Sequence, residues 1–328
     1  MSSWFRPVNL LKLGGLLLLL AIALFGIDFG AALKAIGEAD WWILAGAFLV
    51  LNLALLVRAF RWHLLASQCG LHYEKTIDYY AVFYAGWFAN WLLPQGIGAA
   101  ARLAVVSESG RSFGRGLGAI IIERIADGSA AAVLGLLTFG YVIENGQAPL
   151  FGVIVGLACG GALLLGGLVL LLRRLGPRYG LRERLQKNRF GAQAVNVLDE
   201  TFLAFSQIGR REVAAVAALS FIATSGMAFA FYLTAVAIDI EAPFLLLVAA
   251  YALVNLSLFL PISIQGLGPR EGILIVALAG VGESDEAGVA LGLLWFSLLT
   301  LSRVPGILGW LHTPGRPENV TTARLAER

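Results

Sequence analysis

The chain has 328 residues, of which 59% are hydrophobic and 14% are charged, and its formal net charge is +3. A water-soluble domain of this length could not bury so much apolar surface, so the composition excludes a soluble globular protein and predicts a polytopic membrane protein. The net charge gives no indication of nucleic-acid binding, because in a membrane protein the positions of the charges matter more than their sum.

Eight apolar segments predict the secondary structure in chain order. They span approximately residues 10–27, 41–61, 76–93, 115–141, 149–172, 213–238, 243–260 and 287–311. Several approach the roughly 20 residues with which a helix crosses the hydrocarbon core. The first is expected to be a retained helix, because no clear small-X-small cleavage site closes it. Long runs of Leu, Ala and Gly without a dyad alternation argue against an outer-membrane barrel and predict an all-α fold.

The positions of Lys and Arg predict the topology. The segment 173–212 contains nine of these residues, which places it in the cytoplasm. Basic residues near both ends of the chain predict cytoplasmic N- and C-termini. Arg58, Arg61 and Lys75 are interpreted as marks of a second cytoplasmic loop. The remaining loops are acidic and nearly free of Lys and Arg, so they are placed outside.

Two of the apolar segments are interrupted by a Leu-Pro step, after which the string Gln-Gly-X-Gly follows. The residues of the two turns are Pro94, Gln95, Gly96 and Gly98, and Pro261, Gln265, Gly266 and Gly268. The flanking charges return the chain to the face from which it entered, which predicts re-entrant hairpins at 76–110 and 243–282. Paired breaks of this kind in two halves of a chain indicate a transporter's binding site. In the alternative, each Leu-Pro step is only a kink in a continuous tilted helix.

The segments form two repeats of opposite direction, 10–141 and 149–311. The predicted fold is therefore an inverted-topology repeat with six full transmembrane helices and two opposed re-entrant helical hairpins. The basic segment 173–212 is predicted to contain an amphipathic helix that lies on the anionic inner leaflet, or alternatively docks a partner enzyme. Residues 313–328 are predicted to be a disordered tail. The apolar face of the amphipathic helix consists of Ala194, Leu198, Phe202 and Phe205.

Seven charged residues remain at membrane depth in this topology. They are Arg102, Glu123, Arg124, Asp127, Arg270, Glu271 and Arg303. Each is a candidate for substrate binding, because an unpaired charge in hydrocarbon costs a few kcal/mol. Arg102 and Arg270 follow the two turns and are predicted to line a cavity for an anionic group such as a lipid phosphate. Gln95 and Gln265 lie in the turns themselves and are included in this substrate site.

The acidic residues and the remaining arginines allow more than one interpretation. Glu123 and Asp127 share a helix face at a spacing of four, and they either balance the arginines or receive a cationic head group. Arg270 and Glu271 form either part of the cavity or a buried structural ion pair. Arg303 pairs with an acid or reaches toward the inner surface. The isolated cysteines and histidines predict no disulfide, metal site or cofactor.

These motifs resemble the flippase-like transmembrane family of the lysylphosphatidylglycerol synthases. The resembling segments run from Leu93-Pro94 to Glu123-Arg124-X-X-Asp127, and from Leu260-Pro261-Ile262-Ser263 to Gly266-Leu267-Gly268-Pro269-Arg270-Glu271-Gly272. Gln265 replaces a glycine that the family pattern often shows. The resemblance covers residues 10–311 and implies a bacterial or archaeal inner-membrane protein of lipid traffic.

In two-domain members of that family, this region moves aminoacylated phosphatidylglycerol between leaflets while a soluble domain makes it. The chain is expected to be a stand-alone member without the transferase domain, and not an enzyme. Its expected partners are anionic phospholipids or polyprenyl-phosphate-linked lipids, with a homo-oligomer left open. The leading hypothesis is a flippase-like transporter of an anionic lipid. The alternative is a non-transporting subunit that anchors or presents lipid to a partner glycosyltransferase or lipid-modifying enzyme, with 173–212 as the contact.

Overall fold

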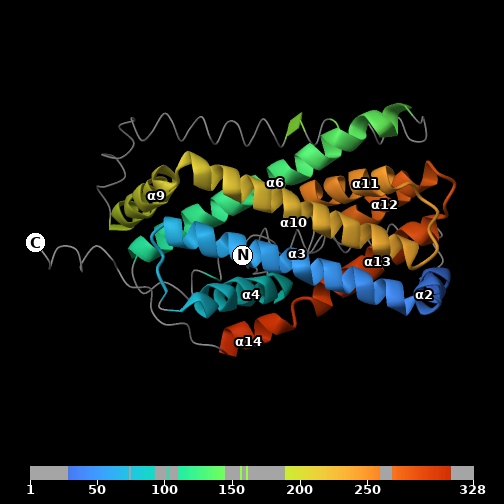
Figure 1. The fold of residues 1–328 in the computed structure, drawn as a ribbon, viewed down its shortest axis with the longest axis horizontal. Helices are drawn as coiled ribbons and strands as arrows, with labels where there is room; N and C mark the ends of the chain where they lie inside the picture. Colours follow the sequence, from blue (N-terminus) through green and yellow to red (C-terminus); the bar gives the residue numbers. More distant parts are fainter. Residues whose placement is uncertain are drawn as a thin grey trace, which may run out of the picture. The chain divides into compact units, whose positions relative to one another are not determined.

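The computed structural model describes residues 29–73, 75–92, 102, 110–144, 156, 160–161, 189–258 and 268–311. All regular elements in these ranges are α-helices, which confirms the predicted all-α class (Figure 1). The helices are α2 (Phe29–Gly37), α3 (Trp41–Gln68), α4 (Thr76–Leu92), α6 (Gly110–Glu144), α9 (Arg189–Gln207), α10 (Arg210–Val236), α11 (Phe244–Ser257), α12 (Pro269–Ala279), α13 (Asp285–Leu301) and α14 (Pro305–Leu311).

Three stretches of the described chain are long and apolar enough to cross a membrane. They are Trp41–Gln68, Arg210–Val236 and Asp285–Gly309. Large apolar side chains of α3 lie exposed along one stripe, at a helical spacing of three or four residues, as expected of a helix that faces lipid. These side chains are Leu49, Leu53, Leu56 and Phe60. The protein is therefore a membrane protein.

Local interactions explain where α3 begins. The Asp40 side chain accepts hydrogen bonds from the backbone N–H groups of Trp42 and Ile43, at 2.8 and 3.2 Å, and so caps the first turn. Trp41 and Trp42 are largely exposed beside this cap. Tryptophan is enriched where a spanning helix leaves the hydrocarbon, so their position agrees with α3 beginning at a membrane surface.

Parts of the predicted repeat lie outside the described residues. These parts are the first predicted helix at 10–27, the predicted helix at 149–172 apart from Gly156, Gly160 and Gly161, and the tail at 313–328. The six-helix count and the inverted repeat consequently remain predictions.

The described helices belong to two compact units. The first comprises Met1–Leu55, Gly128–Leu163 and Phe221–Ser302, and the second comprises Leu56–Asp127, Leu164–Ser220 and Arg303–Arg328. Helices α3, α6 and α10 each contribute one end to each unit.

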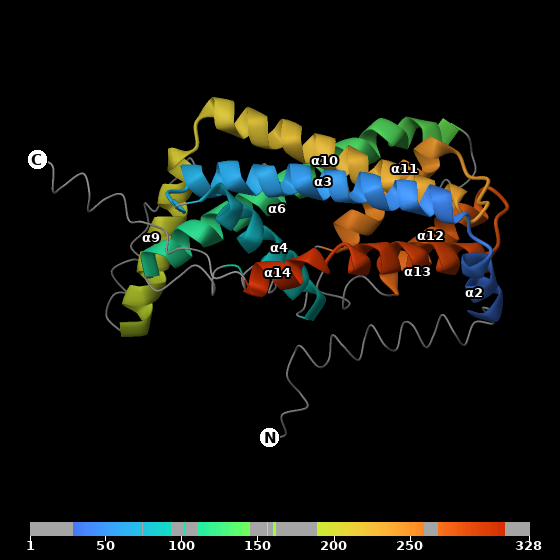
Figure 2. The same ribbon diagram turned by 60° about the horizontal axis from the view of Figure 1, so that its bottom comes forward.

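In the first unit, α12 packs against both α11 and α13, and α13 also contacts α2 (Figure 2). The rings of Phe231, Tyr251 and Trp295 meet in its core, with centroids 5.4 to 6.0 Å apart. The contact between α11 and α12 joins the two helices of the predicted second hairpin, whereas its turn at 259–267 lies outside the described residues.

In the second unit, a core of buried side chains joins α3, α4, α6 and the region around α9. Its largest members include Trp62, Tyr79 and Phe83. Helix α14 packs along α4 through Gly306 and Gly309, where added Cβ atoms would lie 2.6 Å from Phe88 Cβ and 2.5 Å from the Ala81 carbonyl oxygen (Figure 1). Two glycines on one side of α14 therefore allow its backbone to approach α4 closely.

The predicted amphipathic helix exists as α9, but part of its apolar face packs on protein. Thr201 Oγ1 donates to the carbonyl oxygen of Gly114 on α6 at 3.0 Å, and Ala204 and Phe205 are buried. Arg115 of α6 also forms an ion pair with Glu200, at 2.8 Å between Nε and Oε2. Part of α9 thus packs on α6, and the predicted place of its apolar face on the inner leaflet or on a partner enzyme remains a prediction.

The helix predicted at 287–311 is divided. Helix α13 ends at Leu301, a turn follows, and α14 begins at Pro305. Proline has no backbone N–H and disfavours helical backbone in the residue before it, so the regular hydrogen-bond pattern cannot continue through this point. The Gly306 N–H instead donates to the Arg303 carbonyl oxygen three residues earlier, at 2.8 Å.

Candidate functional site

Helix α6 presents Glu123 and Asp127 to the same neighbour, as their spacing of four residues predicts. That neighbour is Arg61 on α3, whose side chain is fully buried. Its Nη2 donates to Glu123 Oε1 at 3.1 Å and to Asp127 Oδ2 at 3.3 Å. Its Nη1 contacts Asp127 Oδ1 and donates to the hydroxyl oxygen of Ser220 on α10, at 2.6 Å in the latter case. Arg61 thus joins three helices of the second unit through one guanidinium group.

Arg102 completes the coordination of Glu123. Its Nη1 donates to Glu123 Oε2 at 2.7 Å, and its guanidinium lies between two aromatic rings, 5.0 Å from the Trp62 centroid and 4.9 Å from the Phe83 centroid. A Cβ atom added at Gly86 of α4 would lie 2.7 Å from Arg102 Cδ. The missing side chain at this position therefore leaves the space through which Arg102 runs.

Two further arginines lie at the same carboxylates without a hydrogen bond to them. Arg58 Nη2 is 3.8 Å from Asp127 Oδ1, which is an ion-pair distance but too long for a hydrogen bond. Arg124 follows Glu123 in the chain and interacts electrostatically with both carboxylates and with the cations of Arg58 and Arg102. Its side chain is half-buried and forms no hydrogen bond within the described part of the chain.

We call this group of four arginines and two acids the charge cluster. Its members are Arg58, Arg61, Arg102, Glu123, Arg124 and Asp127. All of them belong to the second unit. Four cations and two anions leave a formal excess of two positive charges. The Nε atoms of Arg58, Arg61 and Arg102 are buried without a hydrogen-bond acceptor among the described residues. Because unmatched buried cations and donors are costly, the cluster is suited to bind an added anion.

The first unit holds a second buried pair, which is balanced. Arg270 Nε donates to Glu271 Oε1 at 2.9 Å, and the Arg270 guanidinium carbon lies 5.3 Å from the Phe296 ring centroid. Glu271 Oε2 accepts the backbone N–H of Gly268 at 2.7 Å and so caps the start of α12. Gly268 has a φ of 90°, which glycine adopts readily. These contacts support the structural interpretation of Arg270 and Glu271.

The other predicted site residues are placed only in part. Arg303 is buried in the turn before α14, with its guanidinium carbon 5.3 Å from the Trp87 ring centroid. Arg102 belongs to the second unit and Arg270 to the first, so the prediction that these two residues line one cavity remains a prediction. The turn residues Pro94, Gln95, Gly96, Gly98, Pro261, Gln265 and Gly266 lie outside the described residues.

Sequence reasoning missed Arg61 and Arg58 as members of the site. Both were interpreted as cytoplasmic loop residues, but α3 continues to Gln68 and buries them. The prediction was wrong because assigning topology from charges treats every Arg near the end of an apolar run as a loop residue. Their spacing of three residues, which places them on one helix face, and the absence of a helix breaker before Gly70 were the available signals.

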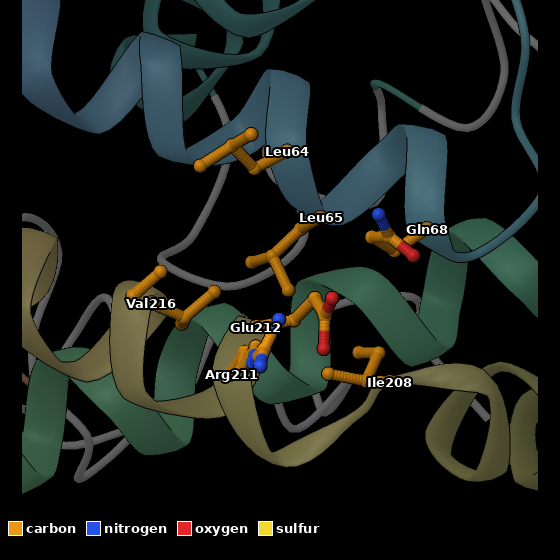
Figure 3. A pocket seen from close by; sticks show the side chains of 8 residues that line it. Leu64, Leu65, Gln68, Ile208, Arg211, Glu212 and Val216 are labelled. Carbon is orange, nitrogen blue, oxygen red and sulfur yellow. The ribbon is translucent and has the colours of Figure 1, made fainter.

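A groove of about 250 Å³ lies apart from the charge cluster, between the end of α3 and the start of α10. In Figure 3, Leu64, Leu65 and Gln68 of α3 lie across from Ile208, Arg211, Glu212 and Val216. Its lining is mainly apolar, and no member of the charge cluster contributes to it.

Comparison with known families identifies the group to which the protein belongs. Residues 9–305 match the family model described as the lysylphosphatidylglycerol synthase TM region. The chain belongs to this family. The matched range includes α2 to α13 and every residue of the charge cluster, so the cluster lies inside the family's own membrane region. No curated protein matches the chain.

Proposed function

We propose that this member of the lysylphosphatidylglycerol synthase TM-region family moves an anionic phospholipid or lipid-linked head group between the leaflets of the cytoplasmic membrane. The observation that carries the proposal is the charge cluster, in which three buried arginines and the half-buried Arg124 face only two carboxylates. A head group that leaves water must exchange its hydration for protein contacts, and guanidinium groups match the oxygens of a phosphate.

The short helices of the first unit support a transport architecture. Helix α11 has 14 residues and α12 has 11, so at about 1.5 Å per residue they reach roughly 21 and 16 Å. Neither length crosses a hydrocarbon core of about 30 Å, whereas two such helices in contact fit a re-entrant hairpin.

A leaflet-resolved lipid assay in proteoliposomes tests the proposal. Fluorescent phosphatidylglycerol in the inner leaflet should become accessible to an external quencher faster with the wild-type protein than in empty liposomes. Replacing Arg102 with Gln removes the partner of Glu123 Oε2 and should slow this movement about tenfold or more, as expected for the loss of one charged hydrogen bond. Arg211→Gln, which lies in the separate groove, is the matched control. Equal rates with wild-type protein and empty liposomes would overturn the proposal.

The groove favours one alternative function. Ile208, Arg211 and Glu212 line it, and all three belong to the cytoplasmic segment predicted to contact a partner. In this alternative the protein presents lipid to a glycosyltransferase or lipid-modifying enzyme and moves none itself. Co-purification of such an enzyme that is lost in the Arg211→Gln variant, together with no lipid movement by the wild-type protein, would favour it.

A further inference from the structure

The arginines of the charge cluster differ in how many hydrogen bonds their side chains form with other residues of the protein. Arg61 gives both terminal nitrogens to Glu123, Asp127 and Ser220, and Arg102 gives one to Glu123. Arg58 lies 3.8 Å from the Asp127 carboxylate, and the side chain of Arg124 forms no hydrogen bond with the described residues. The hydrogen bonds from arginine to both carboxylates therefore come from Arg61 and Arg102, whereas Arg58 adds only a longer ion pair to Asp127.

We propose that Arg58 and Arg124 bind the phosphate of the ligand directly, while Arg61 is a positioning residue that holds Glu123 and Asp127 by hydrogen bonds. This inference rests on the proposed anionic substrate and identifies its recognised group as a phosphate ester. Arg58 supports the assignment through its Nε, which is buried without an acceptor in the described part of the chain. A phosphate offers several oxygens and satisfies such donors from more than one side.

The position of Asp127 makes the ligand and the carboxylate competitors. Asp127 Oδ1 contacts Arg61 and also lies within ion-pair distance of Arg58. A phosphate that binds Arg58 must overcome this attraction. Removing the charge of Asp127 therefore releases Arg58, and it should strengthen phosphate binding even though it removes contacts that hold the fold together.

Binding to the full-length protein in detergent tests these roles. The probe is dihexanoylphosphatidylglycerol, with inorganic phosphate and dihexanoylglycerol as comparison ligands, and the readout is the dissociation constant from calorimetry. Arg58→Gln and Arg124→Gln should each weaken binding of the phospholipid roughly tenfold or more, because each removes a charged contact. Arg58→Lys keeps the charge and should recover part of the loss. Arg211→Gln, in the separate groove, should bind like the wild type.

Variants of Asp127 and Arg61 distinguish a role in positioning the phosphate site from a purely structural role. Asp127→Asn should tighten phospholipid binding, a gain that a merely structural role does not produce. Arg61→Gln should weaken binding, because the freed carboxylates turn to Arg58 and Arg124, and adding Asp127→Asn in the same chain should restore part of the affinity. Thermal unfolding of every variant confirms that the comparison is made on folded protein.

The outcomes are distinct. If inorganic phosphate displaces the phospholipid at a similar concentration, free phosphate alone is sufficient for binding at this site. If only the phospholipid binds, the site recognises a lipid head group. Both results support phosphate binding by Arg58 and Arg124. Unchanged affinity in folded Arg58→Gln and Arg124→Gln variants, or equal binding of the phosphate-free dihexanoylglycerol, overturns it. If these variants bind phospholipid normally and the protein still moves lipid, the transport proposal is supported and the phosphate site is contradicted. If binding depends on these arginines but the protein moves no lipid, the phosphate site is supported and the transport proposal is contradicted.

Discussion

Arg61 and Asp127 lie 66 positions apart in the chain and form a two-pronged ion pair in the buried centre of the second unit. The two terminal nitrogens of Arg61 meet the two carboxylate oxygens of Asp127, and the same nitrogens reach Glu123 and Ser220. A planar guanidinium fork matches a carboxylate in this way, whereas a lysine ammonium cannot. This pair therefore connects α3 to α6 and α10.

Replacing Arg61 with Gln should destabilise the protein by about 3–5 kcal/mol, because it leaves two buried carboxylates with too few partners. The stability of Arg61→Lys should lie between that of Arg61→Gln and that of the wild type, because lysine restores the positive charge without the planar guanidinium group. The measurement is reversible unfolding in detergent followed by tryptophan fluorescence, with Arg211→Gln as the exposed control. A stability equal to that of the wild type would contradict the central place of Arg61 in the cluster.

Gly86→Ala should displace Arg102. The new methyl group would overlap the aliphatic part of the Arg102 side chain, which passes over α4 at this glycine. We expect the ion pair with Glu123 to weaken and phosphatidylglycerol movement to slow, while the helix itself tolerates alanine well. Gly46→Ala is the matched control, because nothing lies within 4 Å of a Cβ atom there. Equal transport rates for the two variants would show that the space at Gly86 does not position Arg102.

Gly306→Leu should separate α14 from α4. A Cβ atom added at Gly306 would lie 2.6 Å from Phe88 Cβ, so a larger side chain has no space between the two helices. We expect a loss of about 1–3 kcal/mol, the usual cost of overpacking, and faster cleavage of α14 in limited proteolysis. Gly46→Leu places the same side chain on α3 at an open position, and it should be cleaved at the wild-type rate. Similar cleavage of both variants would contradict the close contact.

Cys69 should resist thiol reagents between pH 6 and 9. Burial raises the pKa of its thiol to about 12, and the nearby Arg115 cation opposes this shift only in part. The reactive thiolate is therefore scarce in the folded protein. In a Cys159→Ser background, maleimide should label Cys69 far more slowly than a cysteine introduced at the exposed Ser206. Rapid labelling at pH 7 without unfolding would contradict this environment.

The same shift affects stability at high pH. The unfolded thiol loses its proton near pH 8.5 while the folded thiol keeps it, so the unfolded state binds fewer protons above that pH. The free energy of unfolding should consequently fall as the pH rises from about 8.5 toward 12. A Cys69→Ala variant should lose this part of the pH dependence.

Helix positions and one helix face were predictable from the sequence because they depend on local patterns. Apolar runs located α10 and most of α3, and the spacing of four residues placed Glu123 and Asp127 on one side of α6. The division between α13 and α14 follows from Pro305, a local signal that an unbroken apolar run concealed.

The partners of the acids were not predictable because they come from distant helices. Arg61 reaches Asp127 only through tertiary packing, and no spacing in the sequence relates the two. The helix-capping contact between Glu271 and Gly268 was also missed, although the acid stands three residues after the cap position, where such contacts are common. The sequence symmetry of Arg102 and Arg270 therefore concealed a difference, since one belongs to a charged cluster with excess cations and the other to a balanced pair.

The position of lipid phosphate in a structure determined by electron cryomicroscopy in phosphatidylglycerol-containing nanodiscs tests the central claim most directly. The account predicts a phosphate at the charge cluster, with its oxygens about 3 Å from nitrogen atoms of Arg58 or Arg124. A structure in which phosphate density lies only at Arg270 or on the membrane surface, with the cluster empty at high lipid concentration, would contradict it.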